Sequence, residues 1–238
     1  MSPNSPADSQ RDVGVIIPAA GKGERAGQGD LKQFRRIAGV PMLLRAIRPF
    51  AAHPRVAEIA VALPRKFADN PPLWLAELSG EGLRLVAGGE TRTESVLAGL
   101  QALSDRVRIV LVHDAARPFV QTETVSRVID RAAVGVCAVA AIPLADTLKR
   151  VDPHGQRVFE TVPRRGLWRA QTPQGFPRQI LEESYQTWSG NRHTIDATDD
   201  AALVEAAGFP VELVPDRTTN LKVTTPEDFW LAEALAAR

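Results

Sequence analysis

The sequence has little of what several classes of protein require. It holds one cysteine in 238 residues, which excludes a disulfide-stapled scaffold and fits a cytoplasmic protein. Its four histidines are scattered without metal-ligand spacing, so no zinc site is expected. No apolar run approaches the length of a membrane span. Lys and Arg (29) nearly balance Asp and Glu (28), so we expect neither a nucleic acid nor a membrane as a partner.

The first residues also lack the apolar core of a signal peptide. Residues 1–12 are polar and include two prolines, so we expect a disordered tail. The chain is 44% hydrophobic, which is enough for one sizeable α/β domain or for a domain with an appendage. Cys137 lies in the apolar run 134–142, where a buried strand residue is expected rather than a nucleophile.

The stretch 13–34 joins a short apolar strand to a loop rich in glycines and cations. Residues 13–17 are too short for a helix and rich in β-branched side chains, which is typical of a strand buried on both faces. The loop that follows contains Gly21, Lys22, Gly23, Arg25, Gly27, Gly29 and Lys32. Glycine N–H groups can approach an anion closely, and open α/β sheets bind ligands at the carboxyl ends of their strands. We therefore predict a polyphosphate site at this loop.

Other interpretations of this loop fit less well. Residues 21–26 match a dinucleotide fingerprint, but no amphipathic helix follows directly and the second strand, 56–63, does not end in an acidic residue. A P-loop needs Ser or Thr after its Gly-Lys pair, where Gly23 stands here. A surface loop with solvated charges remains the open alternative.

The rest of the chain alternates between strand and helix patterns. Helices are expected at 41–52, 73–78, 91–103, 122–133, 177–188 and 199–207, and strands at 56–63, 83–86, 107–112, 134–142 and 209–214. This alternation predicts the α/β class with a doubly wound, mostly parallel sheet. A further short extended piece is expected at 220–224, before a last helix that begins at Thr225-Pro226.

The helical period disappears between residues 143 and 177. A turn-forming run at 152–155 predicts a hairpin there. The apolar residues Phe159, Val162, Leu167 and Trp168 predict a protruding arm that packs on a partner subunit, giving a homodimer. The arginines of this segment could meet an acidic ligand, and a solvated charged face is the equally open alternative.

Further polar residues follow predicted strands. Gly88-Gly89 leads into the helix at 91–103, where a nucleotide contact and plain helix capping are equally open. Asp114 and Arg117 follow the strand 107–112, at the edge of the sheet where ligands bind, although they could simply pair with each other. Lys222, just before the last helix, is suitably placed to face a phosphate.

Several segments, in their order and spacing, resemble the 2-C-methyl-D-erythritol 4-phosphate cytidylyltransferases. They are PAAGKGER (18–25), LKQF (31–34), GG-x-x-R-x-x-SV (88–96), VHDAARPF (112–119), DT (146–147), TVPR (161–164), LWRAQTPQ (167–174), TDDA (198–201) and NLKVTTPED (220–228). The resemblance implies a doubly wound nucleotidyltransferase domain over 13–238, with an inserted dimerisation arm at about 143–177.

The resemblance also implies roles for individual residues. The CTP loop would contain Ala19, Ala20, Gly21 and Gly23, and the cytosine and ribose side would contact Gly89, Glu90 and Ser95. The triphosphate and transition state would be bound by Arg25, Lys32 and Lys222. The acceptor, methylerythritol phosphate, would be held by Asp114, Arg117, Thr147 and Thr172, with Arg164 reaching its phosphate from a partner's arm. Mg²⁺ would be held mainly by the CTP phosphates.

The implied reaction needs no protein nucleophile. A phosphate oxygen of the acceptor attacks the α-phosphorus of CTP, and pyrophosphate leaves in line, so catalysis rests on alignment and charge stabilisation. Two alternatives remain open: a ribitol 5-phosphate cytidylyltransferase, which would share the nucleotide loop, and a non-catalytic nucleotide-binding regulator.

Overall fold

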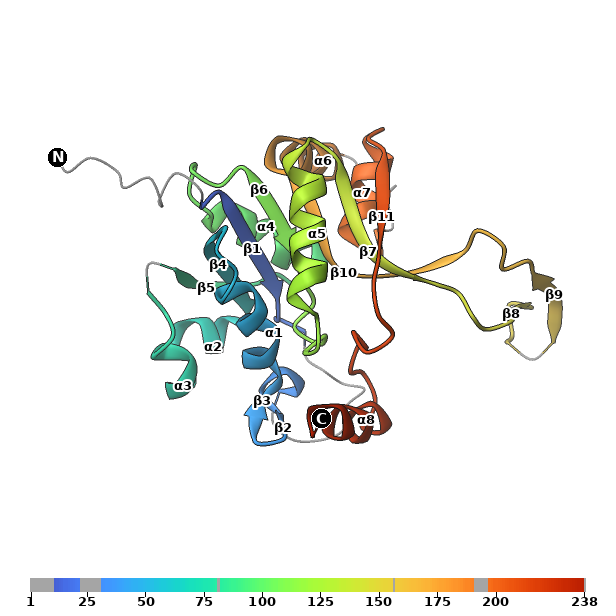
Figure 1. Ribbon diagram of the computed structural model, residues 1–238, viewed down its shortest axis with the longest axis horizontal. Helices are drawn as coiled ribbons and strands as arrows, with labels where there is room; N and C mark the ends of the chain where they lie inside the picture. Colours follow the sequence, from blue (N-terminus) through green and yellow to red (C-terminus); the bar gives the residue numbers. More distant parts are fainter. Residues whose placement is uncertain (1–10, 22–30, 81, 156, 191–196, 238) are drawn as a thin grey trace.

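A seven-stranded sheet forms the centre of the protein. The computed structural model describes residues 11–21, 31–80, 82–155, 157–190 and 197–237. The sheet has the order β11-β7-β10-β6-β1-β4-β5 (Figure 1). Its strands are β1 (Val13–Pro18), β4 (Val56–Leu63), β5 (Leu83–Ala87), β6 (Ile109–Val112), β7 (Cys137–Pro143), β10 (Trp168–Pro177) and β11 (Val211–Pro215). All neighbours are parallel except where β10 pairs with β6 and β7, which confirms the predicted mostly parallel sheet.

Helices cover both faces of this sheet. The side chains of β1 are apolar on both faces, and they alternate between two hydrophobic cores. Val13, Val15 and Ile17 pack with α1 (Met42–Ala51) and α5 (Thr122–Ala133). Ile16 faces the other way and packs in the cluster formed by α4 (Arg92–Ala102), α6 (Arg178–Gly190) and α7 (Asp200–Ala206). The α4 helix lies close on the sheet because Gly99 has no side chain: a Cβ there would come within 2.4 Å of Ile16 Cγ2.

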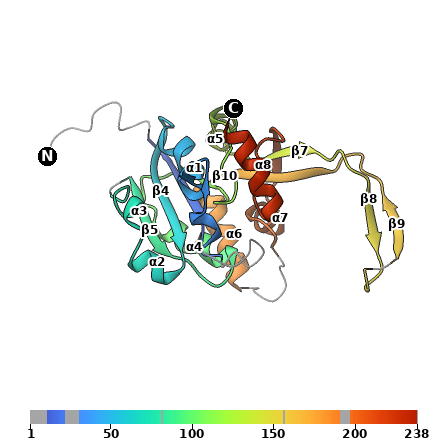
Figure 2. The same cartoon turned by 90° about the horizontal axis from the view of Figure 1, so that it is seen from below.

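Smaller elements surround the edge of the sheet. They are η3 (Lys32–Phe34), β2 (Arg36–Ile37), β3 (Val40–Pro41), α2 (Arg65–Asp69), α3 (Leu73–Ala76) and α8 (Pro226–Ala236). Phe229 of α8 packs with Ile37, Met42 and Val223 in a third core cluster. The start of α8 is fixed by a capping box between Thr225 and Asp228. These contacts hold the segment before α8 against the body of the protein (Figure 2).

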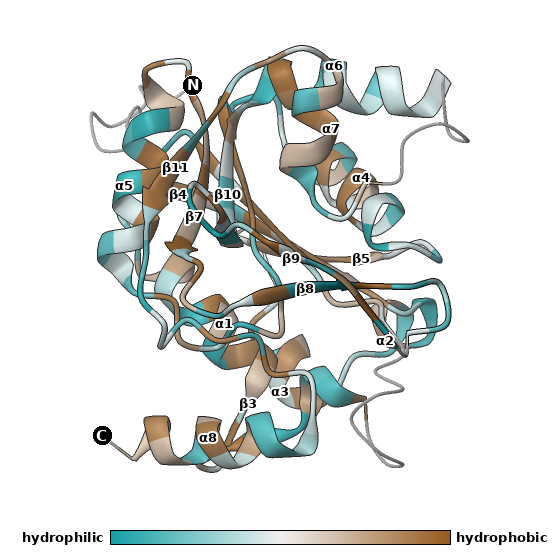
Figure 3. Ribbon diagram, turned by 90° about the vertical axis from the view of Figure 1, so that its right-hand side faces the viewer, coloured by the Kyte–Doolittle hydropathy of each residue, from teal (hydrophilic) through white to brown (hydrophobic). Residues whose placement is uncertain are grey.

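The predicted arm segment 143–177 divides into two parts. The antiparallel strands β8 (Leu148–Val151) and β9 (Val158–Val162) form the expected hairpin, which projects from the sheet (Figures 1 and 2). Residues 168–177 instead form β10 and lie between β7 and β6. Both parts lack a helical period, but residues 171–176 are buried, whereas β8 and most of β9 are exposed. Hydrophobic and hydrophilic residues are mixed on the hairpin (Figure 3).

Most predicted elements lie within a few residues of the observed ones. The strand 56–63 and the helix 122–133 have the predicted bounds, whereas 220–224 is irregular rather than a strand. Cys137 is buried at the start of β7, and burial raises the pKa of its thiol to about 11, as expected for a strand residue. Most of the predicted tail, 1–10, lies outside the described residues, but Asp12 pairs with Arg55 at 2.9 Å. None of the described helices could cross a membrane.

Candidate active site

The loop after β1 lies against the start of α4, so the two predicted nucleotide-binding segments meet. Ala19, Ala20 and Gly21 follow the carboxyl end of β1. Gly88, one residue after β5, lies so close that a Cβ there would come within 2.5 Å of Ala20 Cβ and 2.8 Å of Ser95 Oγ. The predicted residues Gly23 and Arg25 belong to 22–30, outside the described residues.

The first turn of α4 is capped by its own side chains. The Glu94 carboxylate accepts hydrogen bonds from the backbone N–H groups of Glu90 (2.9 Å) and Thr91 (3.1 Å), and Thr91 Oγ1 accepts from the Glu94 N–H. The buried hydroxyl of Ser95 donates to the Thr91 carbonyl. Helix capping, one of the two interpretations of this segment, is therefore confirmed. Contact of Gly89, Glu90 and Ser95 with a nucleotide stays a prediction.

Asp114, at the end of β6, is surrounded by three cations. Lys222 Nζ lies 2.8 Å from Asp114 Oδ2, and Arg92 Nε lies 3.1 Å from Oδ1. Arg117 Nε is more distant, at 3.9 Å, so the pairing of Asp114 with Arg117 considered from the sequence is the weakest of the three. Burial raises the pKa of Asp114, but Arg92, Lys222 and Arg117 together hold it well below its usual range. Asp114 is therefore a carboxylate at neutral pH.

Thr172 connects Asp114 to a buried histidine. His113 Nε2 lies 3.0 Å from the Arg117 carbonyl, which can only accept, so this nitrogen carries the proton. The other ring nitrogen, Nδ1, therefore accepts a hydrogen bond from the Thr172 hydroxyl at 2.9 Å. Thr172 Oγ1 accepts in turn from the Asp114 N–H at 3.0 Å. Burial lowers the pKa of His113 to about 4, which keeps the ring neutral and this arrangement intact.

Lys32 lies near Lys222, although 190 positions separate them in the sequence. Its Nζ donates to the carbonyl of Val223 at 3.0 Å. The next residue, Gln33, donates to the Ala19 carbonyl at 2.6 Å. The short η3 helix thus ties the loop after β1 to the segment before α8, and it brings two of the three predicted catalytic cations to one edge of the sheet.

Two predicted acceptor residues lie on the arm. Thr147 and Arg164 flank the β8–β9 hairpin, and both are exposed. Arg164 donates to the carbonyl of Ala145 within the same arm. A single chain therefore places Asp114, Arg117 and Thr172 together, and it places Thr147 and Arg164 on a separate, projecting element (Figure 1).

Arg92 and Asp200 received no role from sequence reasoning, yet both belong to this site in the structure. Arg92 Nη1 donates to Asp200 Oδ2 at 2.7 Å and so joins α4 to α7. Both residues lie in segments that carry the family resemblance, GG-x-x-R-x-x-SV and TDDA. That was the available signal, but a pair 108 positions apart becomes visible only in the folded chain.

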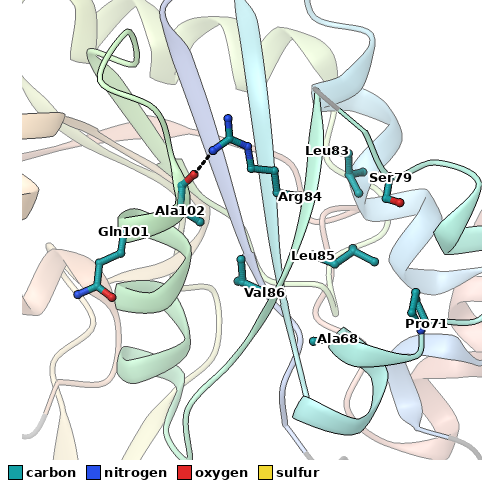
Figure 4. Close-up of a pocket in the computed structure, with 9 residues that line it drawn as sticks. All are labelled: Ala68, Pro71, Ser79, Leu83, Arg84, Leu85, Val86, Gln101 and Ala102. Carbon is teal, nitrogen blue, oxygen red and sulfur yellow. Dashed lines mark hydrogen bonds between the residues drawn. The ribbon is translucent and has the colours of Figure 1, made fainter.

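A hollow of about 660 Å³ lies elsewhere, along the edge strand β5 (Figure 4). Arg84 in its wall donates to the carbonyl of Ala102, the last residue of α4, at the opposite end of that helix from Arg92. None of the predicted site residues that the structure describes lines it. Among the residues with described positions, no group of three His, Cys, Asp or Glu side chains could hold a metal ion.

Comparisons with known proteins agree on one family. Residues 13–238 match the family model described as 2-C-methyl-D-erythritol 4-phosphate cytidylyltransferase. The enzyme of that name from Frankia casuarinae is 45% identical over 95% of this chain and 82% of its own. The enzyme from Syntrophus aciditrophicus is 40% identical over 93% and 94% of the two chains.

The solved structures extend this agreement to the fold. The crystal structure of 2-C-methyl-D-erythritol 4-phosphate cytidylyltransferase from Thermus thermophilus has a TM-score of 0.79 and 39% identity. It covers 95% of this chain and all of its own. With a matching family model, several close relatives and a shared fold, this chain belongs to the 2-C-methyl-D-erythritol 4-phosphate cytidylyltransferase family and is a cytidylyltransferase.

Proposed function

We propose that the chain transfers CMP from CTP to 2-C-methyl-D-erythritol 4-phosphate, and that the cluster around Asp114 is the acceptor site. The products are 4-diphosphocytidyl-2-C-methyl-D-erythritol and pyrophosphate. The observation that carries this proposal is the meeting of Lys222, Arg117 and Thr172 at a buried Asp114, at the carboxyl ends of the parallel strands.

On the nucleotide side, the loop after β1 and the start of α4 form the CTP site. Ala19, Ala20, Gly21 and Gly23 face the phosphates, and Gly89, Glu90 and Ser95 contact the cytidine. This arrangement is supported by the close approach of Gly88 to Ala20 and Ser95. Because Glu94 now accepts from the Glu90 N–H, nucleotide contact at that group requires Glu94 to release it.

Charge stabilisation is the main catalytic contribution of the protein. In the proposed reaction a phosphate oxygen of the acceptor attacks the α-phosphorus, the bond to the bridging oxygen breaks, and pyrophosphate takes the electron pair. Lys32, Lys222 and Arg25 place positive charge where negative charge develops. The contact of Lys32 with the Val223 carbonyl, one residue from Lys222, supports a joint role of the two lysines.

Mg²⁺ is also part of the proposal, as an ion that arrives with the nucleotide. The described residues offer no ligand set of their own, and the Asp114 carboxylate is already engaged by cations. When bound with CTP, such an ion would neutralise part of the phosphate charge and would make the α-phosphorus a better electrophile.

The acceptor assignment is tested by pyrophosphate release in parallel assays. We expect release with CTP and methylerythritol phosphate, and strongly reduced release when ATP replaces CTP. Ribitol 5-phosphate serves as the matched acceptor, because it is also a polyol phosphate. Equal or faster turnover of ribitol 5-phosphate contradicts the proposed substrate, and binding of CTP without release from any acceptor favours a regulator.

The second part of the proposal is a homodimer in which the arm completes the partner's site. Large apolar side chains are exposed along the arm, at Leu148, Val151, Val158, Phe159, Leu167 and Trp168. The exposed fraction of Phe159 is 76%, so a covering surface is expected. Arg164 then contacts the acceptor phosphate in the neighbouring site, and Thr147 of the arm contacts the acceptor with it.

Mixed dimers test this shared site. Arg164→Ala and Lys32→Ala each disable every site of their own homodimer. A heterodimer of the two variants contains one site with both defects and one with neither, so subunit exchange should restore up to about half of wild-type activity per heterodimer. Confirmed exchange without recovery shows that each site is complete within one chain.

The cytoplasmic location expected from the single cysteine stays a prediction.

A further inference from the structure

We propose that Arg92 is a positioning residue of the acceptor site, which holds the Asp114 carboxylate in place by bridging it to Asp200. This inference rests on the proposed function, because it takes Asp114 as a contact of the acceptor. Arg92 itself has no assigned role in the site proposed above.

The guanidinium of Arg92 spans two buried carboxylates. Its Nε donates to Asp114 Oδ1 at 3.1 Å, and its Nη1 donates to Asp200 Oδ2 at 2.7 Å. The side chains of Asp114 and Asp200 are only 11% and 1% exposed. Because the guanidinium is planar and rigid, two such bonds fix the separation and orientation of the two carboxylates.

Asp200 is a firm anchor for this bridge. Its Oδ1 accepts a hydrogen bond from the Tyr185 hydroxyl at 2.7 Å, and Tyr185 is fully buried in the core cluster of α6 and α7. Asp200 is also the first residue of α7, whose start is capped by Asp199 and tied to β10 through Gln174. Packing in the core therefore fixes the position of Asp200, and the Arg92 bridge in turn fixes the position of the Asp114 carboxylate.

The bridge divides the two oxygens of Asp114 between different partners. Arg92 contacts Oδ1, whereas Oδ2 faces Lys222 at 2.8 Å and Arg117 at 3.9 Å. Without Arg92 the carboxylate could rotate, and both oxygens would then compete for Lys222. Arg92 therefore also determines where the Lys222 ammonium group lies before the substrate binds.

The charges around Asp114 support the same role. Burial raises the pKa of Asp114, and Arg92 is the strongest of the charges that lower it, followed by Lys222 and Arg117. The neighbouring His113 is neutral, since its pKa is about 4. Removing Arg92 should therefore raise the pKa of Asp114, so that activity is lost at a higher pH during acidification.

The test compares Arg92→Met with Arg106→Met. Arg106 is a matched control, because its Nε contacts another buried carboxylate, Glu58, at 2.9 Å, outside the proposed site. For Arg92→Met we expect the KM of methylerythritol phosphate to rise about tenfold or more, as for a lost charged hydrogen bond. The KM of CTP should change less than about twofold, and the acid limb of kcat/KM should move to higher pH. Arg106→Met should leave both KM values and the acid limb unchanged.

Two further variants cover the case in which Arg92→Met does not fold. Arg92→Lys keeps the charge but cannot hold both carboxylates. The acid limb of its kcat/KM profile should therefore lie at the wild-type pH, while the KM of the acceptor stays raised. Tyr185→Phe leaves every charge in place and loosens only the anchor, so it should raise the KM of the acceptor by a smaller factor. An unchanged KM for the acceptor in both variants overturns the inference.

Asp114→Asn separates this inference from the proposed function. If Asp114→Asn raises the KM of the acceptor and the Arg92 variants do not, the acceptor site stands and the positioning role is wrong. If Asp114→Asn leaves the KM of the acceptor unchanged, the acceptor site is wrong and the role of Arg92 falls with it. Equal rises in the KM of CTP and of the acceptor for Arg92→Met show that Arg92 binds the nucleotide, which also overturns the inference.

Discussion

Replacing His113 by Gln should flatten the pH dependence of stability below neutrality. His113 is fully buried next to Phe50, with 4.8 Å between the ring centroids, and its ring has a hydrogen-bond partner at each nitrogen. A glutamine amide can keep the donor to the Arg117 carbonyl and does not titrate. The substitution therefore removes the titration of this side chain while it keeps one of its two hydrogen bonds.

The magnitude follows from the two pKa values of the histidine. Burial lowers the pKa of His113 from 6.5 in the unfolded chain to about 4 in the folded protein. On acidification the unfolded state takes up a proton first, so the folded state loses stability between pH 6.5 and 4. A shift of this size corresponds to about 3 kcal/mol over the whole window, of which about 2 kcal/mol is lost between pH 7 and pH 5. Asp114 also lowers the free energy of unfolding on acidification, but only below its unfolded pKa of 3.8, because its folded pKa lies below the usual range.

The assay is urea unfolding at pH 7 and pH 5, with the free energy of unfolding extrapolated to water. The loss of stability between the two pH values should be about 2 kcal/mol smaller for His113→Gln than for the wild type. His53→Asn is the matched control, since burial also lowers the pKa of His53 and its variant should retain the contribution of His113. The same pH dependence in His113→Gln and wild type would refute the buried neutral histidine and the hydrogen-bond directions assigned to Thr172.

Two further predictions concern the site itself. Lys32→Ala should lower kcat by about a hundredfold, or roughly 3 kcal/mol, with a much smaller effect on CTP binding, because its charge is assigned to the transition state. A normal kcat with a raised KM for CTP in steady-state assays would show that Lys32 binds only ground-state phosphate. Thr172→Val should lower the free energy of unfolding by about 3 kcal/mol more than Thr172→Ser, because it leaves the Asp114 N–H and His113 Nδ1 buried without partners. Equal stability of the two variants in urea would contradict those two hydrogen bonds.

Local pattern was sufficient to predict most of the elements that build the central sheet. The strand 56–63 and the helix 122–133 were predicted with their observed bounds. A short, mostly apolar run indicates a strand buried on both faces, and an amphipathic period indicates a helix, so both patterns can be recognised from consecutive residues. The start of α8 was likewise predicted, since Thr225 and Pro226 are local signals of a helix start. The same reasoning placed Gly21, Asp114 and Lys222 beyond strand ends or before a helix, where a parallel sheet gathers its ligands.

Segments without a distinctive period needed the tertiary structure. Residues 143–177 show no helical pattern, and the sequence assigned them all to the arm. The structure separates a projecting hairpin from β10, which enters the sheet antiparallel between β6 and β7. An extended conformation has the same short-range pattern in both settings, and the difference is burial by strands that are distant in the sequence.

The sequence by itself determined which residue types stand at the strand ends, and through family resemblance it assigned most residues of the proposed site. Only the tertiary structure decided how these residues pair. Asp114 is three residues from Arg117, yet its shortest contact is with Lys222, and Arg92 joins it to Asp200. The physical reason is that ion-pair strength depends on distance and burial after the chain has folded, and neither is encoded in the spacing of the residues along the sequence.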